Sequence, residues 1–168
     1  MLVSNLDHVD GPADAPLVLV EYGDYECPHC GAAHPLVKRL QQALAPDLRF
    51  VFRNFPLPEI HPHAMHAAAA AEAAALQGKF WQMHDTLLER QDRLDDRSLA
   101  LYAQELGLDG RTFSDNMQSP DIEKRMAADV LGGERRGVNG TPTFFIQGIR
   151  YDGEHSYEAL LRALTPRN

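Results

Sequence analysis

Cysteine is scarce in this sequence, with two residues in a chain of 168. This excludes a small scaffold stapled by many disulfides. It also excludes a structural zinc site made of cysteines alone, since zinc takes about four nitrogen or sulfur ligands. Basic residues are in the minority as well, with 16 Lys and Arg against 24 Asp and Glu and a net charge of -8. Because phosphate binding depends on clustered Lys and Arg, the sequence predicts no nucleic-acid partner.

Long hydrophobic runs are also missing. The most apolar stretch, Ala64 to Leu76, is interrupted by His66 and Glu72 and is too short to cross the roughly 30 Å of hydrocarbon in a bilayer. Residues 1–14 have neither the basic segment nor the apolar run of a signal peptide. The sequence therefore predicts no membrane insertion and, as written, a cytoplasmic protein. Removal of a signal peptide would instead make it periplasmic or otherwise extracytoplasmic.

The first third of the chain has the pattern of a strand, a helix and a second strand. An apolar, β-branched run at residues 17–22 indicates a buried strand. A helix is expected at about residues 28–44, beginning at Pro28 and bending at Pro35. Alternating residues at 48–53 then indicate a strand with one face more buried than the other.

The rest of the chain predicts helices followed by a hairpin. Helical patterns fill residues 62–136 or thereabouts, strands return at 143–146 and near 150–151, and Ser156 is expected to cap a last helix. The composition, 44% hydrophobic and 24% charged, suits one globular domain. The predicted fold class is α/β, with a mixed central sheet and an inserted all-helical cap at about residues 62–136.

The two cysteines, Cys27 and Cys30, stand three positions apart at the start of the expected helix. A disulfide between them closes so small a ring that it constrains the unfolded chain little, which favours a redox role over a structural one. The N–H groups and dipole of the helix N-terminus stabilise a thiolate on Cys27, and His29 adds to this. Cys27 is expected to be the nucleophile and Cys30 the resolving thiol. Asp24 and Glu26 nearby are expected to be solvated loop carboxylates of weak effect.

Two positions outside this motif are candidates for the same site. Glu21 ends an apolar strand that points toward the helix, where desolvation would raise its pKa and suit it to exchange a proton with Cys30. The alternative for Glu21 is a half-exposed carboxylate with no role. A cis Thr141–Pro142 bond would turn the Thr141 backbone toward an extended peptide, although the sequence alone gives such a bond a chance of about 5%.

These residues lie in two blocks that resemble the DsbA-like thiol-disulfide oxidoreductase family: EYGDYECPHCG at residues 21–31 and GVNGTPTFFIQG at residues 137–148. The stretch between the blocks is also similar to the helical insertion of that family, so the resemblance covers nearly the whole chain. It implies a single thioredoxin-like domain over residues 1–168. It also implies catalysis by the two sulfurs, with no bound cofactor and no metal.

The resemblance assigns roles to individual residues. It implies a nucleophile at Cys27 and a resolving thiol at Cys30, with Pro28 and a tuning histidine, His29, between them. It further implies a buried glutamate at Glu21. A cis-proline is implied at Pro142, where the backbone of Thr141 binds substrate.

The resemblance also implies protein or peptide thiols and disulfides as substrates. The redox partner would be a membrane quinone-linked oxidase, or the thioredoxin or glutathione system, and we expect a monomer. The oxidase direction is favoured. A cytoplasmic reductase or isomerase stays open, because Thr141 stands where valine is common and no export signal is visible.

Two other classes of function remain as alternatives. One is a noncatalytic binder of thiol peptides on the same fold. The other is a metal-binding module in which Cys27 and Cys30 supply two of about four zinc ligands. We favour ordinary polar roles for the histidines that would supply the rest, at a helix start or beside the active-site groove. Those histidines are His34, His61, His63 and His66.

Overall fold

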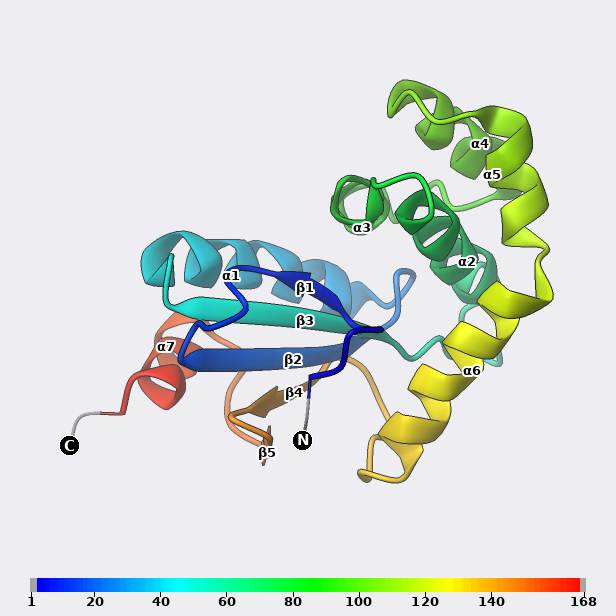
Figure 1. Ribbon diagram of the computed structural model, residues 1–168. Helices are drawn as coiled ribbons and strands as arrows, with labels where there is room; N and C mark the ends of the chain where they lie inside the picture. The colour runs from blue at the N-terminus through cyan, green and yellow to red at the C-terminus, as the bar shows by residue number, and fades with distance from the viewer. Residues whose placement is uncertain (1–2, 167–168) are drawn as a thin grey trace.

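A five-stranded mixed sheet forms the centre of the computed structural model, which describes residues 3–166 (Figure 1). The strand order is β1-β3-β2-β4-β5. β2 and β3 run parallel, and the other neighbouring pairs are antiparallel. This is the mixed sheet that the sequence predicts. The strands are β1 (His8–Asp10), β2 (Leu17–Gly23), β3 (Leu48–Asn54), β4 (Thr143–Ile146) and β5 (Ile149–Tyr151).

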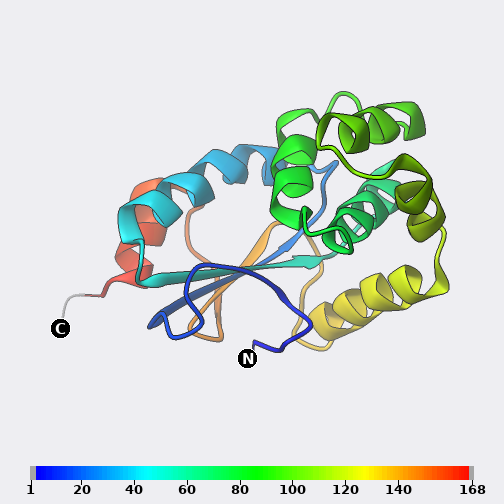
Figure 2. The ribbon, with the colours of Figure 1, turned by 45° about the horizontal axis from the view of Figure 1, so that its top comes forward.

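One helix, α1 (Pro28–Leu44), connects β2 to β3, and five more follow one another between β3 and β4. The five lie where the sequence predicts a helical cap. Figures 1 and 2 show α2 to α5 gathered beyond one end of the sheet, with α6 leading back toward it. The remaining helices are α2 (Ala64–Ala75), α3 (Phe80–Glu89), α4 (Asp96–Glu105), α5 (Gly110–Met117), α6 (Pro120–Glu134) and α7 (Tyr157–Leu164).

Both faces of the sheet are covered by apolar side chains, and the alternation along β2 assigns each residue to a face. Leu19 packs in the larger core, which also contains Val37 of α1. Val20 and Tyr22 pack in a smaller core on the opposite face. Because successive side chains of a strand point to opposite faces, Glu21 lies on the same face as Leu19. A carboxyl group is thus placed on the side of the sheet that α1 covers.

The strands differ from the sequence expectations in two respects. β1 was not predicted, because a three-residue strand is too short to show a period-two pattern; it pairs with β3 at the sheet edge. The second face of β3 is more buried than the alternation at residues 48–53 suggests, although Arg49 on that face is only partly buried. Val51 is buried in the smaller core, and Arg53 is buried with its guanidinium bonded to Asp7 and Tyr22. A charged side chain can occupy a covered face because its polar atoms have partners.

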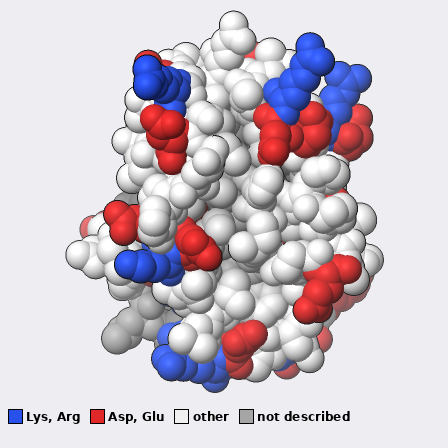
Figure 3. All heavy atoms as spheres, turned by 90° about the vertical axis from the view of Figure 1, so that its right-hand side faces the viewer, with Lys and Arg blue, Asp and Glu red and all other residues white. Residues whose placement is uncertain are grey.

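Charged side chains on the face turned toward the viewer in Figure 3 form small groups around a broad uncharged area. Lys and Arg lie beside Asp and Glu in most of these groups, and among the described residues on this face there is no continuous basic patch. Such a patch is what binding to a phosphate backbone requires. None of the described helices is long and apolar enough to cross a membrane.

The packing of α6 on the sheet yields a stability prediction. A Cβ at Gly133 would lie 2.9 Å from a ring carbon of Phe55 and 3.0 Å from one of Tyr22. We expect Gly133→Ala to lower the free energy of unfolding by about 1–3 kcal/mol through overpacking. This exceeds the gain of at most about 1 kcal/mol from replacing a helical glycine. Denaturant unfolding of the reduced protein measures the difference.

Gly132→Ala is the matched control in the same helix. A Cβ there would approach the flexible end of Arg136 at 3.3 Å and no buried ring so closely, so this variant should be neutral or slightly stabilised. Equal unfolding midpoints for the two variants would contradict the packing argument.

Candidate active site

The candidate site forms where β2 ends and α1 begins. Cys27 is the N-cap of α1 in an extended conformation, and Pro28 occupies the first turn, where a missing N–H costs nothing. The Cys27 N–H donates to the carbonyl of Asp24 at 3.1 Å, and the Cys27 carbonyl accepts from Gly31 N–H at 3.1 Å. The turn thereby presents the Cys27 sulfur at the helix N-terminus, as the sequence predicts.

The two thiols are free and buried. Their environments shift the pKa values of the two sulfurs in opposite directions. The pKa of Cys27 is lowered to about 5, first of all by a hydrogen bond from the Cys30 thiol, while partial burial opposes the shift. Backbone N–H groups of Cys30 and His29 in the first helical turn lower it further. The pKa of Cys30 is raised well above its usual value, mainly by burial. The pair therefore consists of one thiolate and one thiol near neutral pH.

Glu21 is buried on the α1 face of the sheet, with 2% of its surface exposed. Burial, followed by repulsion from the Cys27 thiolate, raises its pKa to about 8. Its negative charge in turn helps to raise the pKa of Cys30. Among the described residues, Oε1 of Glu21 is buried without a hydrogen-bond partner. The half-exposed alternative considered for Glu21 is therefore excluded, because the carboxyl group is buried beside the sulfurs.

Thr141 and Pro142 come from the far end of the chain to the same place. The Thr141–Pro142 peptide bond is cis, and the carbonyl of Thr141 lies 3.5 Å from the Cys27 sulfur, whose thiol donates to it. The side chain of Thr141 also helps to lower the pKa of Cys27. Pro142 is buried and Thr141 is half-buried.

His29 and Pro28 face solvent between the two cysteines. The effect of His29 on the pKa of Cys27 comes from its backbone N–H. No hydrogen bond from the His29 ring to a described residue is seen. From the sequence, both the helix N-terminus and His29 were expected to stabilise the thiolate, and the backbone N–H of His29 is part of that N-terminus.

Asp24 is the largest departure from the sequence expectations at this site. It is buried, with 1% of its surface exposed, and is not a solvated loop carboxylate. Its oxygens accept from the Glu26 N–H at 2.8 Å and the Leu57 N–H at 2.9 Å, and pair with His61 Nδ1 at 2.7 Å. Its own N–H donates to the Cys30 sulfur at 3.4 Å. Asp24 therefore connects the resolving cysteine to the segment that leads into the helical cap.

Gln91 is a second residue that the sequence argument missed. It lies in the loop after α3, and its amide donates to the carbonyls of Tyr25 at 2.9 Å and Cys27 at 2.8 Å. A Cβ on Gly31 would collide with the Gln91 side chain. No local sequence signal marks a glutamine for this role, because its partners lie more than 60 positions away.

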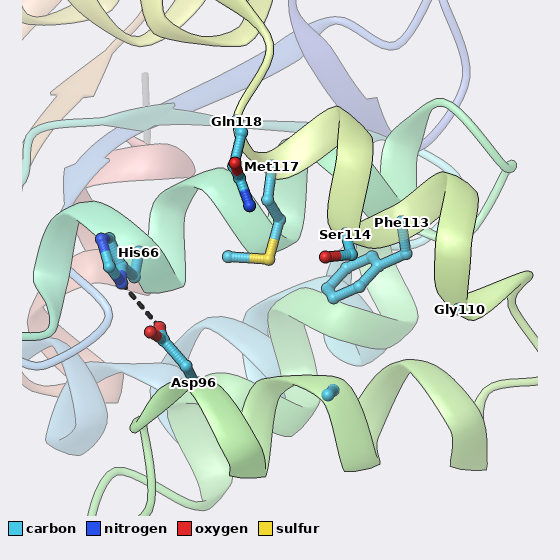
Figure 4. A pocket seen from close by; sticks show the side chains of 8 residues that line it. His66, Asp96, Gly110, Phe113, Ser114, Met117 and Gln118 are labelled. Carbon is cyan, nitrogen blue, oxygen red and sulfur yellow. Dashed lines mark hydrogen bonds and ion pairs between the residues drawn. The ribbon is translucent and has the colours of Figure 1, made fainter.

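The histidines that might have completed a metal site with the cysteines are instead paired with separate carboxylates. His61 pairs with Asp24, and His63 Nδ1 lies 3.3 Å from Glu26. On α2, His66 points toward Asp96 of α4 at 2.6 Å, beside a pocket of the helical cap that Phe113 also lines (Figure 4). Among the described residues, the groups that could hold a metal ion include neither cysteine.

Comparison with known proteins places the chain in a family. The thioredoxin family model matches residues 4–165. A thioredoxin-like oxidoreductase from Silicibacter pomeroyi is 29% identical, with a TM-score of 0.86 over 95% of this chain and 91% of that one. The thiol-disulfide exchange protein alpha-DsbA2 from Wolbachia pipientis shares the fold at 22% identity, with a TM-score of 0.85 over 95% of this chain and 86% of that one. BdbD from Bacillus subtilis does so at 22% identity and a TM-score of 0.83, over 95% and 91%.

The chain therefore belongs to the thioredoxin family. Its fold is that of the DsbA-like members, so the resemblance predicted from the sequence is confirmed. The predicted fold class, a thioredoxin fold with a mixed sheet and an inserted helical cap, is likewise confirmed.

Curated relatives carry a different name. A Na(+)/H(+) antiporter NhaA 1 from Salinispora arenicola is 46% identical over 159 residues, which are 95% of this chain and 24% of the antiporter. Its counterpart from Mycolicibacterium vanbaalenii is 44% identical over 160 residues, 94% of this chain and 26% of the antiporter. The chain thus spans about a quarter of the length of these relatives, and their name describes proteins that are mostly made of other sequence.

The origin of the low Cys27 pKa yields a testable prediction. Alkylation by iodoacetamide should be constant above about pH 6, fall with a midpoint near pH 5, and drop about tenfold per pH unit below it, because the thiolate is the nucleophile. The pH profile of Cys27 alkylation is measured in the natural protein and then in Cys30→Ser and Cys30→Ala, which remove the second thiol. Serine keeps a hydrogen-bond donor beside Cys27 and alanine does not, so the alanine variant should have the higher midpoint. Identical midpoints would show that Cys30 does not stabilise the thiolate.

Proposed function

We propose that the protein exchanges a Cys27–Cys30 disulfide with the thiols of protein or peptide substrates, acting as a disulfide donor. The observation that carries the proposal is the contrast between the two sulfurs, one with its pKa lowered to about 5 and the other with its pKa raised by burial. A stabilised Cys27 thiolate favours the reduced form of the pair. Its disulfide is therefore a strong oxidant, which supports the oxidase direction.

The reaction proceeds through a mixed disulfide. A substrate thiolate attacks the Cys27 sulfur, forming a new S–S bond while the Cys27–Cys30 bond breaks and its electron pair leaves on Cys30. A second substrate thiolate then attacks the substrate sulfur of the mixed disulfide. Cys27 departs as a thiolate, and the substrate is left with a disulfide. A leaving thiol with a low pKa departs faster, so the lowered pKa of Cys27 suits the second step.

Glu21 supplies the proton in the first step. Cys30 leaves into a buried environment where its thiolate is disfavoured, and the neighbouring carboxyl group of Glu21 still holds a proton near neutral pH. In the reverse direction, Glu21 accepts the proton when Cys30 attacks the mixed disulfide. The unpartnered Oε1 of Glu21 supports this role, since no other described group holds that oxygen.

Substrate binds along the segment that contains Thr141 and Pro142. The Thr141 carbonyl lies beside the nucleophilic sulfur, so an extended peptide paired with this backbone brings its own cysteine to Cys27. Pro28 and His29 form the exposed surface between the two cysteines and complete the site.

A disulfide donor needs an oxidising compartment and a partner that reoxidises it. We propose an extracytoplasmic location and a quinone-linked membrane oxidase as that partner. In the cytoplasm, glutathione or thioredoxin would keep the pair reduced, and the same site would act as a reductase or isomerase.

The redox equilibrium of the Cys27–Cys30 pair against glutathione tests the direction. We expect a potential above about -200 mV, toward the value of about -120 mV for DsbA, because the thiolate stabilises the reduced form. A potential near that of thioredoxin, about -270 mV, would instead establish a reductase.

Trapping with Cys30→Ser tests the nucleophile, since this variant should retain substrate as a mixed disulfide on Cys27.

The role of Glu21 is tested by Glu21→Gln, which is nearly isosteric. Release of substrate by Cys30 should slow by about a hundredfold, the usual scale of general acid–base catalysis. In the natural protein this step should accelerate as pH rises through the pKa of the Glu21 carboxyl group, which burial still raises above its usual value when Cys27 is held in the mixed disulfide, and the variant should lose that dependence. Rapid-quench kinetics of the mixed disulfide give both results. An unchanged rate and pH profile would rule out Glu21 as the proton acceptor.

A further inference from the structure

A group of potential metal ligands lies between α1 and α3, apart from the two sulfurs. His34 stands four positions after Cys30 on α1, and His84 and Asp85 are neighbours on α3. One ligand atom from each of the three lies within 4.8 Å of the others. His34 Nε2 lies 3.7 Å from Asp85 Oδ1. The cluster thus joins the active-site helix to the helical cap.

The two carboxylate oxygens of Asp85 differ in their contacts: one forms an ion pair and the other has no hydrogen-bond partner among the described residues. Its Oδ2 is 2.8 Å from the ammonium group of Lys38. Its Oδ1 is buried and has no hydrogen-bond partner among the described residues, although the side chain as a whole is 30% exposed. A buried carboxylate oxygen without a donor is costly, and it faces the ring of His34. The surrounding ion pairs do not explain why this oxygen is buried without a donor.

His84 is buried and held by a partner of the kind that metal-binding histidines have. Its Nδ1 lies 3.0 Å from the Tyr25 hydroxyl. When Nδ1–H donates to that oxygen, Nε2 carries the lone pair and can bind a metal. The Tyr25 hydroxyl therefore takes the place of the second partner that usually orients a ligating histidine.

Glu89 lies one turn after Asp85 on α3 and can complete the set. Its Oε1 is 3.2 Å from His34 Nε2. The side chain is 60% exposed, so it can move toward an ion without disturbing the core. Two carboxylates and the ammonium of Lys38 leave the cluster with one net negative charge when both imidazoles are neutral, and this charge favours a divalent cation.

A simple ion-pair network is the competing explanation. A protonated His34 between Asp85 and Glu89 accounts for the 3.2 Å contact with Glu89. It does not account for Asp85 Oδ1, because 3.7 Å is too long for a hydrogen bond.

We propose that His34, His84 and Asp85, with Glu89 as the fourth ligand, form a binding site for a divalent transition metal ion of the zinc class. Two imidazoles and two carboxylates suit such an ion, whereas calcium and magnesium prefer oxygen ligands alone. Zinc bonds of about 2.0–2.1 Å place tetrahedral ligands about 3.4 Å apart. The ligand atoms must therefore move together by up to about 1.4 Å, which side-chain rotation can supply.

The site would fasten α3 to α1 one turn beyond Cys30. Its effect would also reach Tyr25, which precedes the nucleophile by two positions. Because the ion binds the folded state, it raises the free energy of unfolding in proportion to the logarithm of its concentration.

The test uses the oxidised protein, whose disulfide removes both thiolates as competing ligands. Titration with Co²⁺ should show one equivalent bound, with visible bands of nitrogen and oxygen ligation and no thiolate charge-transfer band. Zn²⁺ should displace it. Asp85→Asn and His34→Gln should each weaken binding at least about tenfold, and Tyr25→Phe should weaken it by a similar factor through the orienting contact.

His66→Gln is the matched control, because His66 also pairs with a carboxylate but lies on α2; its affinity should equal that of the natural protein. Glu89→Gln guards against misfolding, since an exposed residue can be changed without loss of the core, and it too should bind more weakly. Circular dichroism confirms that each variant is folded. Absence of a one-equivalent Co²⁺ site, or equal affinity in the folded Asp85, Glu89 and His66 variants, would overturn the proposal.

Discussion

The contact between the Cys27 sulfur and the first turn of α1 is the interaction on which the rest of the site depends. A thiolate at this position needs donors, and they come from the Cys30 thiol and from backbone N–H groups that the helix leaves unpaired. The donors are useful only if the turn cannot relax away from the sulfur. The surrounding structure supplies that restraint from three directions: the end of β2, the Thr141 segment, and the helical cap.

The helical cap is part of the active site and not only a cover for the sheet. Gln91 reaches from the loop after α3 to the carbonyls of Tyr25 and Cys27, and it fits against α1 because Gly31 has no side chain there. Asp24 connects the opposite side of the turn to His61 in the segment before α2. Hydrogen bonds to a buried carboxylate are stronger than those between neutral groups. The turn is therefore held by two segments, the loop after α3 and the segment before α2.

Much of the site around Cys27 could be predicted from the sequence, because the residues that form it are neighbours in the chain. The strand before Cys27, the proline after it and the spacing to Cys30 are neighbours in the chain, and local patterns report such features well. Glu21 was also within reach, because strand alternation determines the face it occupies. Asp24 and Gln91 were not, since their roles depend on partners tens of positions away that only the tertiary structure brings close. The strand β1 was not predicted for a different reason, because three residues are too few to show the period-two pattern of a strand.

The charge on Cys27 and the protonation of Glu21 depend on each other. The Cys27 thiolate raises the pKa of Glu21 by repulsion, in addition to the effect of burial. Formation of the disulfide removes that charge, so the pKa of Glu21 must then be lower than in the reduced protein. Reduction of the pair consequently makes the protonation of Glu21 more complete, in addition to the proton that Cys30 takes up. The carboxyl group holds its proton most firmly while Cys27 is a thiolate, and this keeps two negative charges from sharing one buried site.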